Sequence, residues 1–261
     1  MKQRLDVLLC EKGYAQSRER AKELIENGQV LVCGKTAKKA GQSVEDTVQI
    51  EITGEQNPYV SRGGLKLDKA IQAFGLILSD AVAMDIGAST GGFTQCMLKN
   101  GAKKVYAVDV GTDQLHQSLK EDVRVINMEK TNIRNLPLTE IEPLDFISVD
   151  VSFISLKLVL PKVAEFLKPM GKAVLLIKPQ FEAGKQHLNK KGVVKDKKVH
   201  LSVVQEIVGF AEQLSLAPLR LDFSPIRGPE GNIEYLLLVQ KDGTAASVDA
   251  EQTVLKSHEI L

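Results

Sequence analysis

The sequence has few cysteines, no long apolar run and almost no net charge, and each lack removes a class of protein. Its three cysteines, Cys10, Cys33 and Cys96, show no Cys-x-x-Cys spacing, which indicates neither a disulfide framework nor a zinc site and favours a reducing, cytoplasmic compartment. No stretch is long enough to span a bilayer, and Asp6 interrupts the short apolar run near the start. We therefore predict no membrane span and no signal peptide. The four histidines lack ligand spacing, so no metal is expected.

The net charge of +1 conceals two basic segments. Residues 1–40 contain nine Lys or Arg against five Asp or Glu, and residues 182–200 contain six Lys against two acids. Such clusters are usually solvated surface. Two of them on a nearly neutral chain make a polyanion, such as a nucleic acid, a candidate partner.

A chain of 261 residues with 43% apolar content accommodates a small module and a larger domain. In residues 1–57 the patterns predict amphipathic helices over 4–12 and 17–27, the second capped by Ser17 and ended by Gly28, and short strands around 29–32 and 48–52. Residues 54–58 would be a linker, and residues 58–243 the larger domain. Residues 244–261 would be a tail or a peripheral helix.

Residues 83–93 place an acid at the end of a buried strand, followed by a loop of small residues that opens a helix. Asp85 leads this loop, and Asp109, 24 residues further on, ends another strand, where a carboxylate fits a pair of ribose hydroxyls. The dinucleotide fingerprint G-x-G-x-x-G has the same logic, but Ser89 replaces its middle glycine. A leading acid suits a positively charged ligand without a phosphate, which favours S-adenosylmethionine over NAD; an ordinary tight turn is the alternative. The predicted cofactor contacts are Asp85, Gly87, Ala88, Ser89, Gly91, Gly92, Phe93, Asp109, Val110 and Glu129.

Strand and helix patterns alternate beyond residue 58, with a helix over 65–74 that stops at Gly75. Runs such as 172–178 are apolar on both faces and belong in the middle of a mostly parallel sheet. Together with the glycine loop, this predicts an α/β fold: a Rossmann-like class I methyltransferase sheet of seven mostly parallel strands, preceded by a small α+β domain. The seven strands are predicted at 82–86, 104–109, 123–127, 145–150, 172–178, 217–224 and 234–240.

Four charged residues stand beside the predicted cofactor loop: Lys66, Asp150, Lys178 and Glu234. A lysine that ends an apolar strand needs carboxylate partners, because burying an unpaired ammonium is costly. We expect Asp150 and Glu234 to flank Lys178, which would orient a ribose hydroxyl and stabilise negative charge on its oxygen during methyl transfer. A structural ion-pair network is an equally simple interpretation. Transfer to a base amino group is another, but the prolines typical of such enzymes are missing after Asp150.

These residues resemble a known family, the TlyA (hemolysin A) group of FtsJ-like ribosomal RNA 2′-O-methyltransferases. The loop Asp-Ile-Gly-Ala-Ser-Thr-Gly-Gly-Phe and a Lys, Asp, Lys, Glu tetrad carry the likeness, and by motif the tetrad falls on Lys66, Asp150, Lys178 and Glu234, with Lys69 a less favoured first lysine. Residues 15–18 (Ala-Gln-Ser-Arg) and 25–30 are similar to segments of an S4 RNA-binding domain. The resemblance implies S-adenosylmethionine-dependent methylation of cytidine ribose in ribosomal RNA or ribosomal subunits. A non-catalytic RNA-binding protein that uses the S4-like module is the alternative function, whereas a pore-forming toxin, which the family name suggests, has no support in the sequence.

Basic side chains of the first module are expected to contact RNA phosphates without reading much sequence. The lysine-rich stretch 185–198 is either a mobile flap over the RNA or a plain surface loop. The predicted RNA contacts are Lys2, Arg4, Arg18, Arg20, Lys22 and Arg62.

Overall fold

The computed structural model describes residues 2–15, 17–26, 28–53 and 57–261, and these form two compact units, Met1–Gln56 and Asn57–Leu261. Gln16, Asn27 and most of the predicted linker 54–58 lie outside the described residues. The helices of the described part of the chain are all too short or too polar to cross a bilayer.

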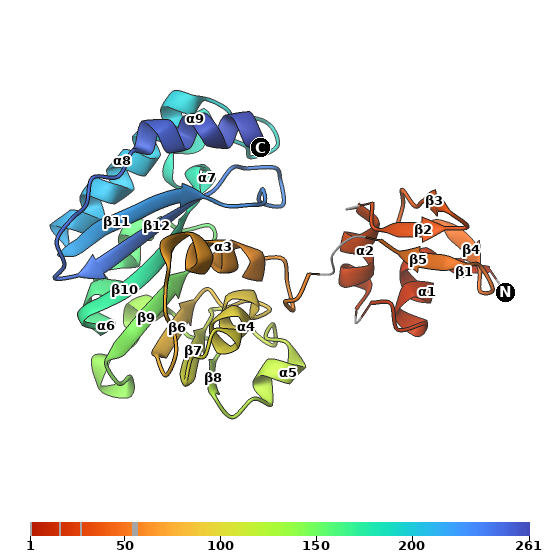
Figure 1. Cartoon of the computed structure of the whole chain (residues 1–261), viewed down its shortest axis with the longest axis horizontal. Coiled ribbons are helices and arrows are strands. Elements are labelled where there is room, and N and C mark those ends of the chain that lie inside the picture. Colours follow the sequence, from red (N-terminus) through yellow and green to blue (C-terminus); the bar gives the residue numbers. More distant parts are fainter. Residues whose placement is uncertain (1, 16, 27, 54–56) are drawn as a thin grey trace. The chain divides into compact units, whose positions relative to one another are not determined.

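The first unit packs two helices against small antiparallel sheets (Figure 1). Its apolar core comes from one face of each helix, with Leu5, Leu9, Leu24 and Ile25 among the buried side chains. The Ser17 hydroxyl accepts the backbone N–H of Arg20 at 3.2 Å, as predicted for an N-cap. The elements are β1 (Lys2–Arg4), α1 (Leu5–Glu11), α2 (Arg18–Glu26), β2 (Val30–Val32), β3 (Lys35–Thr36), β4 (Ser43–Glu45) and β5 (Ile50–Ile52).

The second unit is built on a seven-stranded sheet in the order β11-β12-β10-β9-β6-β7-β8 (Figure 1). Strand β12 runs antiparallel to β10 and β11, and the pairs from β10 to β8 are parallel, so the predicted fold class is confirmed. The strands are β6 (Val82–Ile86), β7 (Lys104–Val108), β8 (Val125–Met128), β9 (Leu144–Val149), β10 (Leu167–Ile177), β11 (Leu216–Phe223) and β12 (Tyr235–Lys241).

Helices cover both faces of this sheet, because its strands are apolar on both sides. Alternate strand residues such as Ala83 and Val174 pack under α3 and α4, and their neighbours Met84 and Leu175 pack on the opposite face with α6 and α8. The helices are α3 (Gly64–Phe74), α4 (Gly92–Lys99), α5 (Gln117–Lys120), α6 (Leu160–Phe166), α7 (Pro179–Glu182), α8 (Lys197–Gln213) and α9 (Ala250–Ile260), with short 3-10 turns η1 (Ile133–Asn135), η2 (Leu138–Glu140), η3 (Leu156–Leu158) and η4 (Lys185–His187).

Residues 250–260, expected in a tail or a peripheral helix, form α9, which is fixed to the unit by a buried polar network. The Tyr235 hydroxyl lies 2.7 Å from Nδ1 of His200 and 3.2 Å from Oγ of Ser257 on α9. Nε2 of His200 donates to the carbonyl of Val194 at 2.9 Å. The ring of His258 packs on His200, 4.7 Å between centroids.

This network predicts acid sensitivity. Burial lowers the pKa of His200, and burial together with the positive charges of His200, Lys197 and Arg227 lowers the pKa of His258 to about 4. The pKa of a histidine in the unfolded chain is about 6.5. The neutral rings therefore contribute their full free energy to folding above that pH, and this contribution is lost as the pH falls toward about 4. Denaturant unfolding at a series of pH values should show that the free energy of unfolding decreases as the pH is lowered through this range.

His258→Gln should flatten that pH dependence, because one of the titrating rings is gone. His187→Gln, which removes an exposed histidine, is the matched control and should leave the curve unchanged. Equal curves for wild type and His258→Gln would show that the network does not couple to protons.

Candidate active site

Asp85 lies at the carboxyl end of β6 and binds the first turn of α4, which follows the glycine loop. It is fully buried and accepts hydrogen bonds from the backbone N–H of Thr94 at 2.8 Å, the Thr94 hydroxyl at 2.7 Å and the Ser148 hydroxyl at 3.1 Å. Burial raises its pKa to about 7. Because both oxygens are engaged by the protein, Asp85 positions the first turn of α4 rather than meeting a ligand itself.

The glycines of the loop lie close to other atoms of the protein, so that a side chain would not fit at these positions. Gly87 has φ +86°, and a Cβ there would lie 2.3 Å from the carbonyl oxygen of Asp150. A Cβ on Gly91 would meet the side chain of Leu119 at 2.2 Å, and one on Gly92 would meet Oγ of Ser61 at 2.4 Å. The loop is therefore fitted between the start of α3 and the segment that follows β9.

Asp109, which follows β7, is held by the backbone and remains partly exposed. One carboxylate oxygen accepts the N–H of Ser89 at 2.8 Å, and the other accepts the N–H of Gly111 at 2.7 Å. Glu129 holds the next loop by accepting the N–H groups of Gln114 at 2.6 Å and Leu115 at 3.1 Å, and these bonds lower its pKa to about 2.

These residues fit S-adenosylmethionine. A carboxylate fixed by two amides keeps lone pairs for ribose hydroxyls, and Ser89 and Val110 are exposed beside Asp109. Buried Ala88 and Phe93 support the loop from inside the unit. Of the predicted cofactor contacts, Gly87, Ser89, Asp109 and Val110 are at least partly exposed, whereas Asp85, Gly91 and Gly92 are buried and Glu129 holds the neighbouring loop.

The four predicted catalytic residues form two ion pairs at the carboxyl end of the sheet. Nζ of Lys178 lies 2.5 Å from Oδ1 of Asp150, and Nζ of Lys66 lies 2.6 Å from Oε2 of Glu234. Lys66, Lys178 and Glu234 are buried, with 6%, 8% and 1% of their surfaces exposed. Pairing offsets the cost of removing such charges from water.

The expectation that Asp150 and Glu234 both flank Lys178 is wrong. Glu234 precedes β12, against which α3 packs, and Lys66 on α3 reaches it first. The second neighbour of Lys178 is instead the Ser152 hydroxyl, at 3.0 Å. Lys69, the less favoured first lysine, pairs with Asp222 at 3.0 Å.

A cavity of about 630 Å³ opens beside these ion pairs, a volume suited to a nucleotide-sized ligand. Lys178 and Glu234 line it, together with Ser152, Phe153 and Phe181. Sequence reasoning missed the last three as functional residues. The one available signal was Phe153, an aromatic residue three positions after Asp150. In the structure it is 92% exposed and has φ +63°.

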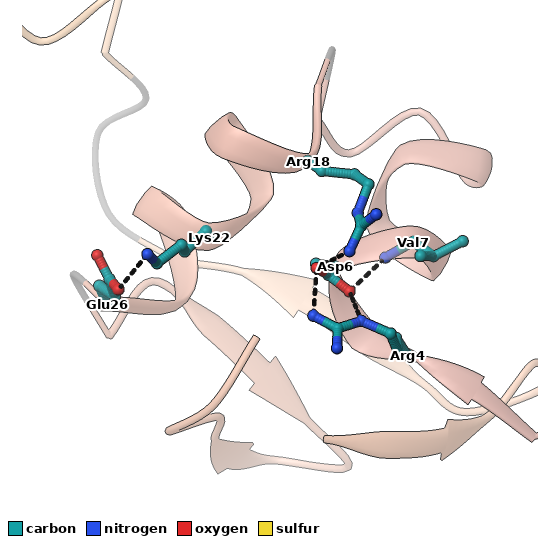
Figure 2. Close-up of polar contacts among 6 residues, drawn as sticks. All are labelled: Arg4, Asp6, Val7, Arg18, Lys22 and Glu26. Atoms are coloured by element: carbon teal, nitrogen blue, oxygen red, sulfur yellow. Dashed lines mark hydrogen bonds and ion pairs between the residues drawn. The ribbon is translucent and has the colours of Figure 1, made fainter. Parts of the chain in front are cut away.

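The basic side chains predicted to meet RNA gather on the first unit, and several are already paired (Figure 2). Arg4 binds the buried carboxylate of Asp6 through two bonds of 2.9 and 3.0 Å, and Arg18 binds it at 3.0 Å. These cations hold the pKa of Asp6 well below its usual range. Two guanidiniums on one carboxylate leave a net positive charge, with both arginine side chains more than half exposed.

The remaining predicted RNA contacts differ in their environment. Lys22 pairs with Glu26 at 3.6 Å, and Lys2 lies 3.8 Å from Glu45. Arg20 follows the N-cap of α2, and Arg62 precedes α3 in the second unit, half-buried. Within the described ranges no group of three His, Cys, Asp or Glu side chains converges as metal ligands would.

Comparison with known proteins assigns both units. The model of the FtsJ-like methyltransferases matches residues 59–241, well over half of the chain. The chain belongs to the FtsJ-like methyltransferase family. The S4 domain model matches residues 3–50, so the first unit is an S4 domain.

Relatives of this FtsJ-like chain align with it over most of their length and most of its own. YqxC of Bacillus subtilis (strain 168), provisionally named an rRNA methyltransferase, is 46% identical over 239 residues, covering 90% of this chain and 85% of its own. TlyA of Mycobacterium tuberculosis (strain ATCC 25618 / H37Rv), named a 16S/23S rRNA (cytidine-2′-O)-methyltransferase, is 40% identical and covers 90% and 88%. A solved Streptococcus thermophilus structure that carries a hemolysin name is 41% identical, has a TM-score of 0.80, and covers 99% and 96%.

Gly87→Ala should disrupt this FtsJ-like site, since the added methyl group would push the Asp150 carbonyl and displace the partner of Lys178. We expect cofactor binding by calorimetry to weaken at least about tenfold and stability to fall by about 1–3 kcal/mol. Gly75→Ala is the matched control: it has φ +63° but nothing within 4 Å of its Cβ, so it carries the backbone strain without the clash. Equal losses of cofactor binding in both variants would contradict this prediction.

Proposed function

We propose that this chain transfers the methyl group of S-adenosylmethionine to the 2′-oxygen of a cytidine ribose in 16S or 23S ribosomal RNA. The observation that carries the proposal is the Lys178–Asp150 pair, held next to the glycine loop and facing a nucleotide-sized cavity. The choice of cytidine follows the printed name of the TlyA relative. Such a substrate would place the protein in the cytoplasm, with ribosomes or their subunits.

Lys178 is suited to hold the attacking oxygen. An ammonium has three N–H donors; one is given to the Ser152 hydroxyl, Asp150 pairs with the ammonium as an ion, and Lys178 lines the cavity, where a ligand can accept from it. Donation to the ribose oxygen orients it and stabilises the negative charge that develops there. Asp150 keeps the ammonium in place and, with water, provides a route for the hydroxyl proton.

Glu234 and Lys66 have a supporting part. Glu234 lines the cavity, whereas Lys66 binds it from α3 and is almost inaccessible. We propose that Lys66 fixes the Glu234 carboxylate, which lines the cavity and accepts a hydrogen bond from the substrate. S-adenosylmethionine, when bound, would supply an electrophilic methyl group: a C–O bond would form as the C–S bond breaks, and the hydroxyl proton would pass toward Asp150 and water.

Lys178→Ala should lower kcat for methyl transfer by about 10²–10³-fold, because the donor to the developing charge is removed. Binding of S-adenosylmethionine by calorimetry should be retained. Mass spectrometry of ribosomal RNA treated with each variant measures the product and shows whether the methyl group sits on ribose or base. Lys69→Ala, which removes a nearby ion-paired lysine, is the control. A base-methylated product, or full activity in Lys178→Ala, would overturn the proposed mechanism.

Phe153 is placed to stack on the base of the target nucleotide. Its ring is exposed at the cavity, 5.1 Å from the ring of Phe181. A non-glycine residue at φ +63° costs about 1–2 kcal/mol. A stacked base contributes about 1–3 kcal/mol, enough to offset that strain.

Phe153→Ala should therefore raise KM for RNA by about tenfold or more, with no loss of thermal stability. Leu158→Ala, which removes another exposed apolar side chain, should leave KM unchanged. If Phe153→Ala lowers the melting temperature and leaves KM as it was, the ring is structural.

A further inference from the structure

The loop between α7 and α8 carries unpaired positive charge. Four lysines, Lys185, Lys190, Lys191 and Lys195, lie in this loop, and two more begin α8; none of the six forms an ion pair with any residue that the structure describes. The contrast within the same unit is clear, since eight other lysines are ion-paired there: Lys66, Lys69, Lys104, Lys120, Lys157, Lys162, Lys168 and Lys178.

This loop has a defined conformation. The side-chain oxygen of Asn189 accepts the N–H of Lys191 at 2.8 Å and that of Val193 at 3.0 Å. Asn232, which is buried, accepts the N–H of Val194 at 3.1 Å and donates to the carbonyl of Gly192 at 3.1 Å. The lysines thus extend from a fixed backbone, which lowers the conformational entropy lost when they bind a ligand.

The lysines border the catalytic cavity and continue beyond it. Lys185 and Gly192 line the cavity itself. Lys190, Lys191 and Lys195 line an adjoining hollow of about 460 Å³, together with Arg227. Glu230 lines both spaces, so the hollow begins where the cavity ends. A chain-like ligand with one unit in the cavity would continue into the hollow.

We propose that this hollow binds RNA backbone phosphates next to the nucleotide in the cavity. Its basic side chains, here called the rim, are Lys190, Lys191, Lys195 and Arg227. The inference rests on the proposed function for the identity of that nucleotide. Phosphates repeat along a strand, and lysines bind them as point charges without reading bases. The rim therefore anchors the strand on the catalytic unit, separately from the S4 domain.

The test measures binding of the full-length protein to a fluorescent single-stranded RNA of mixed sequence over a series of KCl concentrations. For Lys190→Ala/Lys191→Ala, the slope of log K against log salt should shrink by roughly 1, and affinity at low salt should fall roughly tenfold. Glu230→Gln removes the acid between the two spaces and should bind about threefold tighter. The matched control, Lys103→Ala/Lys172→Ala, removes two lysines without ion pairs near the opposite edge of the sheet and should bind as wild type.

An unchanged slope in the rim variant, or an equal loss in the control, would overturn the inference. So would a rim variant that binds RNA normally but loses binding to phosphatidylglycerol vesicles. Failure of the proposed function is distinguishable, because it would appear as wild-type protein that binds RNA with the full salt dependence but adds no methyl group to ribosomal RNA.

Discussion

The site depends on two ammonium–carboxylate pairs being kept out of water at the carboxyl end of one sheet. Each charge alone would be costly to bury, so each pair is stable only while both partners stay in register. The sheet supplies that register. Strand β10 lies between β9 and β12, so that Lys178 after β10, Asp150 after β9 and Glu234 before β12 lie at the same end of the sheet. Helix α3 then brings Lys66 to Glu234 from outside the sheet.

The glycine loop extends this constraint to the cofactor side. Its backbone touches the Asp150 carbonyl at Gly87 and the start of α3 at Gly92. Asp150 is the partner of Lys178, and α3 carries Lys66. The same loop therefore fixes both ion pairs, and a change in its backbone would be felt by the methyl acceptor site as well as by the cofactor. Close packing against its own chain requires glycine at these positions.

Much of this arrangement follows from the sequence, because buried strands have a strong local pattern. The apolar runs placed the seven strands to within a few residues, except that β10 begins at Leu167 rather than at 172. The pairing of Lys178 with Asp150 was also predictable, since both follow neighbouring strands. The partner of Glu234 was not, because the path of α3 over β12 is a tertiary property that strand spacing does not encode. His200 looked isolated for the same reason: its side-chain partner Tyr235, which in turn contacts Ser257, is distant in sequence.

Charges that hold the structure and charges that are free for a ligand are separated in the second unit. The buried lysines have carboxylate partners at 2.5–2.6 Å, and so do several lysines around the sheet. The lysines of the loop before α8 have none among the described residues, although hydrogen bonds fix their backbone. An exposed ion pair contributes little to stability, so leaving these lysines unpaired costs the fold almost nothing. Without carboxylate partners, these lysines keep their full charge for a polyanion. Because they lie beside the cavity, an RNA strand with one nucleotide in the cavity would extend along them.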